Sequence, residues 1–190
     1  MSATEVILVN RSDTEIGRAE KLIAHRLALR HRAFSIFIIR QIPQTNQFEI
    51  LLQQRAEKKY HSGGLWSNSC CGHPRPGNFP IELEANRRLK EELGFSVPIG
   101  EFATFSYLHR FQNGLTEYEI VHLFLGKNNN NKIIHPNPEE VNKTRWERPE
   151  KIRNELFGDD KKSFTPWFQE AFRIFETNVA KFLLTNENQK

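Results

Sequence analysis

The feature of this sequence that most constrains its fold is a single well-marked helix in the middle of the chain. Residues 80–93 are mostly helix-forming residues, carry Glu82 and Glu84 in the first turn, and are followed directly by Gly94. Acidic residues near a helix start and a glycine just past its end are usual helix signals. The segments on both sides have the pattern of β-strands, which excludes an all-helical fold and a regular alternation of strands and helices.

The remaining chain is dominated by strand-like segments. We predict strands at residues 6–9, 15–18, 34–39, 48–53, 102–111, 118–125 and 144–147. Turn-forming residues separate the first two strands and the next two, so each pair is predicted to form a hairpin, the second one supplying central strands. Residues 61–78 are rich in Gly, Pro, Ser and Asn, and we expect a loop with little regular structure there.

A second helix is predicted near the end of the chain. After Pro166, apolar residues recur at spacings of three and four: Trp167, Phe168, Ala171, Phe172, Phe175, Val179, Phe182 and Leu183. This period gives an amphipathic helix, expected at about residues 163–184 and packed on the sheet. The elements together predict one α/β domain of the α+β kind over residues 1–190, with a mixed β-sheet flanked by helices. Its core is expected at about residues 30–150, after an N-terminal extension of residues 1–29 that carries the first hairpin.

Composition excludes several classes of protein. Apolar residues make up 38% of the chain and charged residues 26%, which is enough to build one core and excludes disordered and fibrous proteins. No apolar stretch approaches the roughly 18 residues that cross a bilayer, and the first residues lack the pattern of a signal peptide, so we expect a cytoplasmic protein. The two cysteines, Cys70 and Cys71, are adjacent and cannot frame a disulfide-rich fold.

The net charge of +4 is concentrated in the first half of the chain. Ten of the Lys and Arg residues lie between Arg11 and Lys59. This surplus favours an anionic partner, but it is small for a nucleic-acid binder. A small phosphorylated ligand fits the charge at least as well.

Two short segments place reactive side chains on one side of the backbone. Cys71 and His73 are two residues apart, and so are Glu117 and Glu119. Side chains at positions i and i+2 of an extended chain point the same way, so each pair can face one cavity. Adjacent carboxylates that share a cavity need a cation or a shared proton, which indicates metal binding or acid–base chemistry. The alternative for both pairs is structural: a buried thiol beside a loop histidine, and a solvated strand face.

Further histidines and carboxylates are candidates for ligands. His25 and His31 are six residues apart, which is not a spacing of one helix face, so a shared ligand would need strand or loop geometry. We interpret the others as structural: His61, His109, His122 and His135. Glu91 and Glu92 precede the glycine that ends the helix, where they can hold a divalent cation or pair with basic residues on the helix surface.

Several of the segments described above, taken together, resemble those of a known family. Residues 87–95 resemble the end of a Nudix box, and together with residues 67–74 and 117–119 they resemble the type 1 isopentenyl-diphosphate Δ-isomerases. Other segments follow in the order of that family: Glu20-Lys21, His25, His31, Ala33-Phe34-Ser35, Gln54-Arg55-Ala56, Lys58-Lys59 and Leu65-Trp66-Ser67-Asn68. The resemblance covers residues 5 to about 182. It implies a Nudix-like fold and an isomerase of isoprenoid biosynthesis that converts isopentenyl diphosphate to dimethylallyl diphosphate by metal-dependent protonation and deprotonation.

The resemblance also implies roles for individual residues. Cys71 and Glu119 would be the acid and base groups, Tyr107 would lie near Glu119, and Trp167 would face the reacting carbons. The diphosphate would be bound by Lys21, Arg55, Lys59 and Arg88. One divalent metal, Zn²⁺, Mn²⁺ or Mg²⁺, would be held by His25, His31, His73, Glu117 and Glu119. A separate Mg²⁺ would be held by Glu92 and the diphosphate, with Cys71 counted among the metal-site residues. No flavin is implied.

The sequence departs from related patterns at a few positions. A Nudix hydrolase would have Glu at the position of Arg88 and an acidic residue at that of Phe79, so the resemblance argues against hydrolysis. His61-Ser62 stands where many members of the isomerase family carry an aromatic residue and proline, and Cys70 adds a second thiol.

Two other functions compete with this interpretation. One is a Nudix pyrophosphohydrolase acting on a nucleoside diphosphate derivative, which would share the fold. The other is an RNA-binding or zinc-stabilised module without catalytic activity, which would leave Glu117 and Glu119 unexplained. The isomerase hypothesis predicts a small-molecule substrate, no nucleic-acid or membrane partner, and a monomer or weak homo-oligomer.

Overall fold

The computed structural model describes residues 5–77, 79–129, 132–158 and 162–187. Its centre is a nine-stranded sheet. The strands are β1 (Glu5–Val9), β2 (Glu15–Glu20), β3 (His31–Gln41), β4 (Phe48–Arg55), β5 (Trp66–Ser67), β6 (Cys70–Gly72), β7 (Ile99–Arg110), β8 (Thr116–Lys127) and β9 (Val141–Glu147). The predicted strands and hairpins are therefore present, and the α+β class is confirmed.

Strand β3 organises the sheet because four strands pair with it. Strands β1, β4 and β6 run antiparallel to β3, and β8 runs parallel to it, so the sheet is mixed as predicted. Both faces of β3 are apolar: Phe34, Ile36 and Ile38 belong to one buried cluster, and Phe37 and Ile39 to another. A strand buried on both sides reads as a nearly continuous apolar run, which explains the sequence of residues 33–39.

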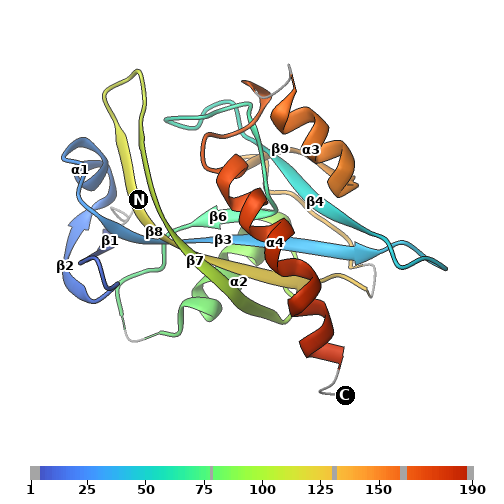
Figure 1. The fold of residues 1–190 in the computed structure, drawn as a ribbon. Coiled ribbons are helices and arrows are strands. Elements are labelled where there is room, and N and C mark those ends of the chain that lie inside the picture. Colours follow the sequence, from blue (N-terminus) through green and yellow to red (C-terminus); the bar gives the residue numbers. More distant parts are fainter. Residues whose placement is uncertain (1–4, 78, 130–131, 159–161, 188–190) are drawn as a thin grey trace.

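Helices cover the two faces of the sheet (Figure 1). Helix α2 (Ile81–Leu93) packs on one face through Ala85, Leu89 and Leu93, and it ends at Gly94, whose φ of 78° lies in the left-handed region. Helices α3 (Pro149–Phe157) and α4 (Phe168–Glu187) pack on the other face. The short helix α1 (Lys21–Arg26) follows the N-terminal hairpin. Among the described residues, no helix has the length and apolar character needed to cross a membrane.

Several expectations about local structure were wrong. The predicted loop of residues 61–78 contains β5 and β6, whose formation depends on pairing with distant strands: β6 pairs with residues 34–36 of β3. Helix α1 was not predicted because it has only six residues and is stabilised by a local cap, in which the Glu20 carboxylate accepts from the backbone N–H groups of Leu22 and Ile23. Helix α3, which begins with Pro149, was also missed. Helix α4 begins at Phe168, so Trp167 precedes it.

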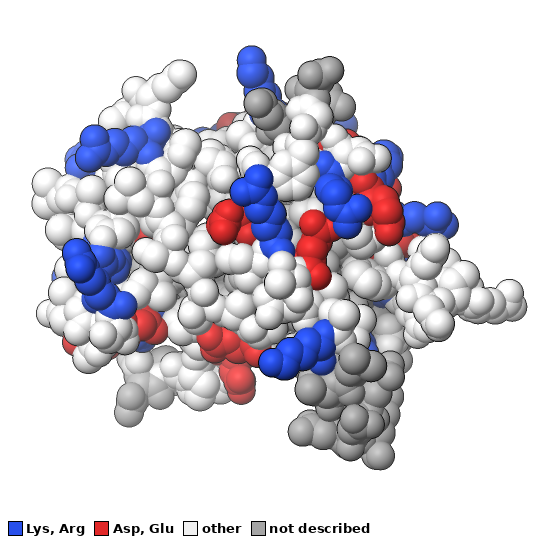
Figure 2. All heavy atoms as spheres, viewed as in Figure 1, with Lys and Arg blue, Asp and Glu red and all other residues white. Residues whose placement is uncertain are grey.

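The charged side chains on the face seen in Figure 1 do not gather into one basic region. Figure 2 shows Lys and Arg scattered over this face, several of them beside Asp or Glu. Ion pairs such as Arg145–Glu155 and Arg153–Glu176 balance part of the basic charge of the molecule. This face therefore lacks the continuous basic stripe of a typical nucleic-acid binder.

Candidate active site

The candidate site lies where β8, β3 and β6 run side by side near the start of β3. In the parallel pairing of β3 with β8, His31 is opposite Glu119. In the antiparallel pairing of β3 with β6, Ser35 is opposite Cys71. Residues that are far apart in the sequence are thus brought together by strand register, with His73 directly after β6.

Three imidazoles and one carboxylate converge at this point. Ligand atoms of His25, His31, His73 and Glu119 all lie within 4.8 Å of one another. Nε2 of His31 is 3.2 Å from Nε2 of His25 and 3.1 Å from Nε2 of His73, and Nε2 of His73 is 2.9 Å from Oε1 of Glu119. His25 comes from α1, His31 and Glu119 from strands, and His73 from the residue directly after β6. The group is therefore not built on one helix face, as the spacing of His25 and His31 required.

The protonation of these rings suits a metal site. Nδ1 of His31 donates to the backbone oxygen of Leu29 at 2.8 Å, so a neutral ring has its lone pair on Nε2, which faces the group. Burial first, and then neighbouring positive charge, lowers the pKa of His25 and of His73 to about 3. Neutral imidazole nitrogens and a carboxylate oxygen are a donor set for Zn²⁺, Mn²⁺ or a similar divalent ion.

The second glutamate of the pair lies beside this group. Glu117 is buried, and its Oε1 is 3.2 Å from Nε2 of His61. Its Oε2 is buried and has no hydrogen-bond partner among the described residues. Burial and the neighbouring charge of Glu119 raise the pKa of Glu117 well above its usual range, whereas the adjacent rings of His31 and His73 outweigh burial and hold the pKa of Glu119 well below it. An orphaned buried oxygen and a strained carboxylate pair are features that a bound cation would relieve.

The two adjacent cysteines face opposite sides of the sheet. Cys70 is fully buried and belongs to the apolar cluster under α2. Cys71 points to the other side, where it lines the same cavity as His73 and Glu119. Successive side chains of a strand point in opposite directions, so only Cys71 can act in this cavity.

A hydrogen-bonded network surrounds the thiol of Cys71. Its Sγ donates to Oδ1 of Asn68 at 3.2 Å and is 3.3 Å from Oγ of Ser35. Burial raises the pKa of this thiol, although hydrogen bonds from Ser35 and Ser67 oppose that effect. Ser67 also accepts the indole N–H of Trp167 at 3.1 Å, which fixes the orientation of that ring.

An inner pocket of about 50 Å³ connects these groups. It is lined by Lys21, Ser35, Arg55, His61, Cys71, His73, Glu117, Glu119 and Trp167, among others. A site of this size has room for roughly four water-sized groups, so it admits only a small, short ligand. Tyr107 is opposite Glu119 in the pairing of β7 with β8, and burial, followed by the charges of the two glutamates, raises the pKa of its hydroxyl.

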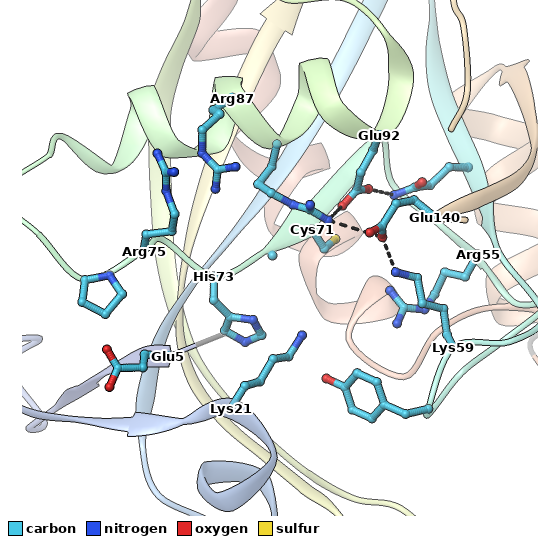
Figure 3. A pocket seen from close by; sticks show the side chains of 15 residues that line it. Glu5, Lys21, Arg55, Lys59, Cys71, His73, Arg75, Arg87, Glu92 and Glu140 are labelled. Atoms are coloured by element: carbon cyan, nitrogen blue, oxygen red, sulfur yellow. Dashed lines mark hydrogen bonds and ion pairs between the residues drawn. The ribbon is translucent and has the colours of Figure 1, made fainter. Parts of the chain in front are cut away.

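A wider outer cleft of about 520 Å³ opens beside the inner pocket (Figure 3). Cys71 and His73 lie between Lys21 and Lys59 on one side and Arg75 and Arg87 on the other. Lys21 and Arg55 have no carboxylate partner among the described residues: the Lys21 ammonium lies 5.1 Å from the Tyr60 ring centre. This cleft therefore offers cations that are in no ion pair among the described residues, directly beside the small pocket.

The other Lys and Arg side chains of the outer cleft are paired with carboxylates. Lys59 and Arg88 both contact the carboxylate of Glu140. Arg88 also contacts the carboxylate of Glu92, which is buried and accepts a hydrogen bond from Nε2 of Gln53 at 3.1 Å. Glu92 thus faces the cleft, but its charge is balanced by the Arg88 guanidinium in this arrangement.

Most of the predicted site residues line these two cavities. His25 and His31 lie in the adjoining His/Glu group, and Tyr107 is opposite Glu119 in the sheet. The structure also adds residues that were not predicted. His61 was interpreted as structural but lies in the inner pocket against Glu117. Ser35, Ser67 and Asn68 surround Cys71, and Glu140 joins the outer cleft. His61 and Glu140 had no sequence signal, since single polar residues in loops are usually structural or exposed. His122 lies away from the site, where it pairs with Asp13 and Glu101.

Comparison with known proteins finds close sequence relatives. A model of the NUDIX domain family matches residues 29–168. An isopentenyl-diphosphate Delta-isomerase 2 from Photorhabdus laumondii is 42% identical over 86% of this chain and 88% of its own length. Isopentenyl-diphosphate Delta-isomerases from Burkholderia multivorans (43% identical, 86% of this chain, 88% of the relative) and Pectobacterium atrosepticum (40%, 90% and 91%) are similarly related.

Solved structures share the fold at much lower identity. A protein from Deinococcus radiodurans matches with a TM-score of 0.63 at 20% identity, covering 89% of this chain and 97% of that one. The MutT protein from Methanosarcina mazei matches with a TM-score of 0.59 at 18% identity, covering 85% and 96%. At such identities the likeness concerns the fold alone, and it confirms the Nudix-like architecture expected from the sequence.

Proposed function

The chain belongs to the NUDIX domain family and, within it, to the isopentenyl-diphosphate Delta-isomerases, and we propose how its two cavities carry out the reaction of that family. The enzyme converts isopentenyl diphosphate to dimethylallyl diphosphate. A proton is added to the terminal methylene carbon C4 and another is removed from C2, while the double bond moves from C3–C4 to C2–C3. No atom other than hydrogen is exchanged.

One observation carries the assignment of the acid and base groups. Cys71 and Glu119 line the same small pocket, and they come from β6 and β8, the strands that flank β3. Glu119 is opposite His31 and Cys71 is opposite Ser35, four residues further along β3, so the two positions leave room for a five-carbon unit between their side chains. Each group can exchange a proton with one side of that unit, as a 1,3-shift requires.

The diphosphate is proposed to bind in the outer cleft. Lys21 and Arg55, which lack carboxylate partners among the described residues, supply the attraction, with Lys59 and Arg88 joining when the substrate competes with Glu140. Glu92 is proposed to hold a Mg²⁺ together with the diphosphate, since Mg²⁺ is commonly bound by one or two carboxylates and substrate phosphates.

His25, His31, His73 and Glu119, with Glu117 as a further donor, are proposed to hold a second divalent cation. A cation there supplies positive charge that lets both glutamates stay ionised and fixes the carboxylate of Glu119 beside the pocket. The ligand set suits Zn²⁺, Mn²⁺ or Mg²⁺. The proposed reaction moves protons and no electrons, so it requires no flavin.

The pocket must also tolerate positive charge on carbon. Protonation of an alkene creates carbocation character at C3, which water would trap, so the wall of the pocket must exclude water. Trp167 is buried and held by Ser67, and its ring lines the inner pocket. An aromatic face can stabilise an adjacent cation by about 0.5 to 2 kcal/mol.

The partners follow from the same geometry. Unpaired cations gathered inside a cleft favour a small anionic substrate, and the scattered charges of Figure 2 do not favour nucleic acid. We propose a cytoplasmic enzyme without a membrane partner, active as a monomer or weak homo-oligomer.

The test is proton NMR of the purified protein with isopentenyl diphosphate and Mg²⁺ in deuterated water, with phosphate assayed in the same sample. Deuterated dimethylallyl diphosphate without phosphate release is the expected result. A folded, metal-loaded sample that releases phosphate or nucleotide from nucleoside diphosphate derivatives, and does not isomerise, would instead identify a hydrolase.

A further inference from the structure

His61 is a buried histidine that neither the sequence pattern nor the proposed proton transfers use. It lies between β4 and β5, in a loop closed by backbone hydrogen bonds from Arg55 to Leu65 (2.9 Å) and from Gly64 to Arg55 (3.1 Å). The next residue, Ser62, has a φ of 52°, in the left-handed region that non-glycine residues seldom adopt. A strained residue in a closed loop that carries a buried histidine indicates a required orientation of that histidine.

Each ring nitrogen of His61 has a polar group close to it. Its Nε2 is 3.2 Å from Oε1 of Glu117, and its Nδ1 is 3.3 Å from Oγ of Ser62. In the ionised form in which a carboxylate binds a cation, both oxygens only accept hydrogen bonds, so Nε2 is the donor. Nδ1 of a neutral ring then accepts from the Ser62 hydroxyl, so both ring nitrogens of His61 are satisfied.

Aromatic contacts fix the plane of the same ring. His61 stacks on Phe111 with ring centres 4.5 Å apart and an angle of 24°, and it meets Trp167 edge to face at 6.0 Å. Its backbone oxygen lies 3.4 Å from a guanidinium nitrogen of Arg55. The ring is thus held between the wall of the inner pocket and the carboxylate of Glu117.

We propose that His61 is a positioning residue that orients Glu117 toward the His/Glu cation site. Its Nε2 contacts Oε1, so the other oxygen, the buried Oε2, which has no hydrogen-bond partner among the described residues, is the one that remains for a cation. Glu117 lies two residues from Glu119 on the same side of β8, which brings this oxygen to the inner pocket. The inference rests on the proposed function, because it concerns the metal of the proposed isomerase. Hydrogen-bond partners of metal ligands commonly change metal affinity or activity by 10- to 100-fold.

The experiment compares His61→Phe with His61→Gln. Phenylalanine keeps the stacking on Phe111 and removes the donor, whereas glutamine keeps a donor and removes the ring. Affinity for Zn²⁺ and Mn²⁺ is measured by competition with a chelating dye, and kcat and KM are measured on the same preparations. We expect His61→Phe to weaken metal binding by about 10- to 100-fold, with KM for the diphosphate substrate changed by less than about threefold, and His61→Gln to recover most of the affinity.

A mutant cycle with Glu117→Gln locates the effect. The loss caused by His61→Phe should disappear when Glu117 is already Gln, because the bond being removed acts through that carboxylate. Wild-type metal affinity in His61→Phe, or an equal loss in both backgrounds, would overturn the proposal. If His61→Phe does not fold, His61→Met carries the same expectation. A wild-type protein that binds the metal but has no isomerase activity would contradict the proposed function. The metal affinities of the His61 variants would still test the role of His61 in that case.

Discussion

The outer cleft and the inner pocket share several residues, among them Lys21, Arg55, Cys71 and His73, but differ in size and in the rest of their walls. The outer cleft has a volume of about 520 Å³ and is lined by Lys and Arg side chains, two of which have no carboxylate partner among the described residues. The inner pocket has a volume of about 50 Å³. Burial in it lowers the pKa of histidines and raises that of the Cys71 thiol.

The difference between the two cavities explains how a small domain can bind a diphosphate and also protonate a hydrocarbon. The charged groups that attract the substrate are gathered in the wide outer cleft, and burial already lowers the pKa of one of them, Lys21, to about 8. Groups that exchange protons with carbon lie where water is excluded, so that a carbocation-like state survives. Substitutions in the inner pocket should therefore lower kcat, and substitutions in the outer cleft should raise KM.

The largest effect is expected for Cys71→Ala. Removal of an acid or base group from the inner pocket should lower kcat by about 10² to 10⁴ and leave KM nearly unchanged. Steady-state kinetics with isopentenyl diphosphate measures both constants. The matched control is Cys70→Ala, because Cys70 lies on the opposite side of the sheet under α2. Cys71→Ala with wild-type kcat, or an equal loss in Cys70→Ala, would remove Cys71 from the mechanism.

The next effect is expected in the outer cleft. Lys59→Met removes one cation from the proposed diphosphate site, and a hydrogen bond to a charged group contributes about 1.5 to 3 kcal/mol. KM should rise by about 10- to 100-fold while kcat changes less than about threefold. Lys58→Met, at the exposed neighbouring position, should leave both constants unchanged. A decrease in kcat without a rise in KM would contradict the assignment of substrate binding to the outer cleft and of proton transfer to the inner pocket.

The pH dependence of substrate capture should report Lys21. Burial, and then the charge of Arg55, lowers the pKa of Lys21 to about 8. The ammonium is charged below that pH and loses its charge above it, so kcat/KM should be level below pH 8 and about tenfold lower at pH 9. In Lys21→Arg the fall should move to higher pH, because a guanidinium stays protonated. An unchanged profile in that variant would assign the fall to another group.

The smallest effect is expected for Trp167→Phe. The substitution removes the indole N–H that Ser67 accepts and weakens the attraction of the ring for a cation. A loss of about three- to tenfold in kcat is expected, within the range of a single cation–π contact. Trp146→Phe is the control, because Trp146 lies on β9 against Arg40, outside both cavities. An unchanged kcat in Trp167→Phe would mean that Trp167 only packs beneath α4 and does not stabilise the reacting carbons.

Much of the fold could be predicted because its signals are local. The helix that ends just before Gly94, the strand predicted at residues 34–39 and the amphipathic helix after Pro166 each carry their own periodicity or end signal. Strand β6 could not be predicted in this way. Its three residues form a strand only because they pair with β3, about 35 residues earlier in the chain.

Part of the site could be predicted because the spacing of two residues in an extended chain determines which way their side chains point. The i, i+2 pairs Cys71–His73 and Glu117–Glu119 face one cavity as expected for extended chain. That His25 joins His31 and His73 depends on α1, a six-residue helix that folds back toward the sheet. His61 could not be assigned from sequence, because its role depends on the distance to Glu117, more than 50 residues away in the chain.

The central claim is that the diphosphate occupies the outer cleft while the five-carbon chain occupies the inner pocket. The most direct measurement is a crystal structure of Cys71→Ala with isopentenyl diphosphate and Mg²⁺. The account predicts the diphosphate against Lys21 and Arg55, and the carbon chain between position 71, Glu119 and the ring of Trp167. A substrate bound with its hydrocarbon end in the outer cleft, or away from Glu119, would contradict it.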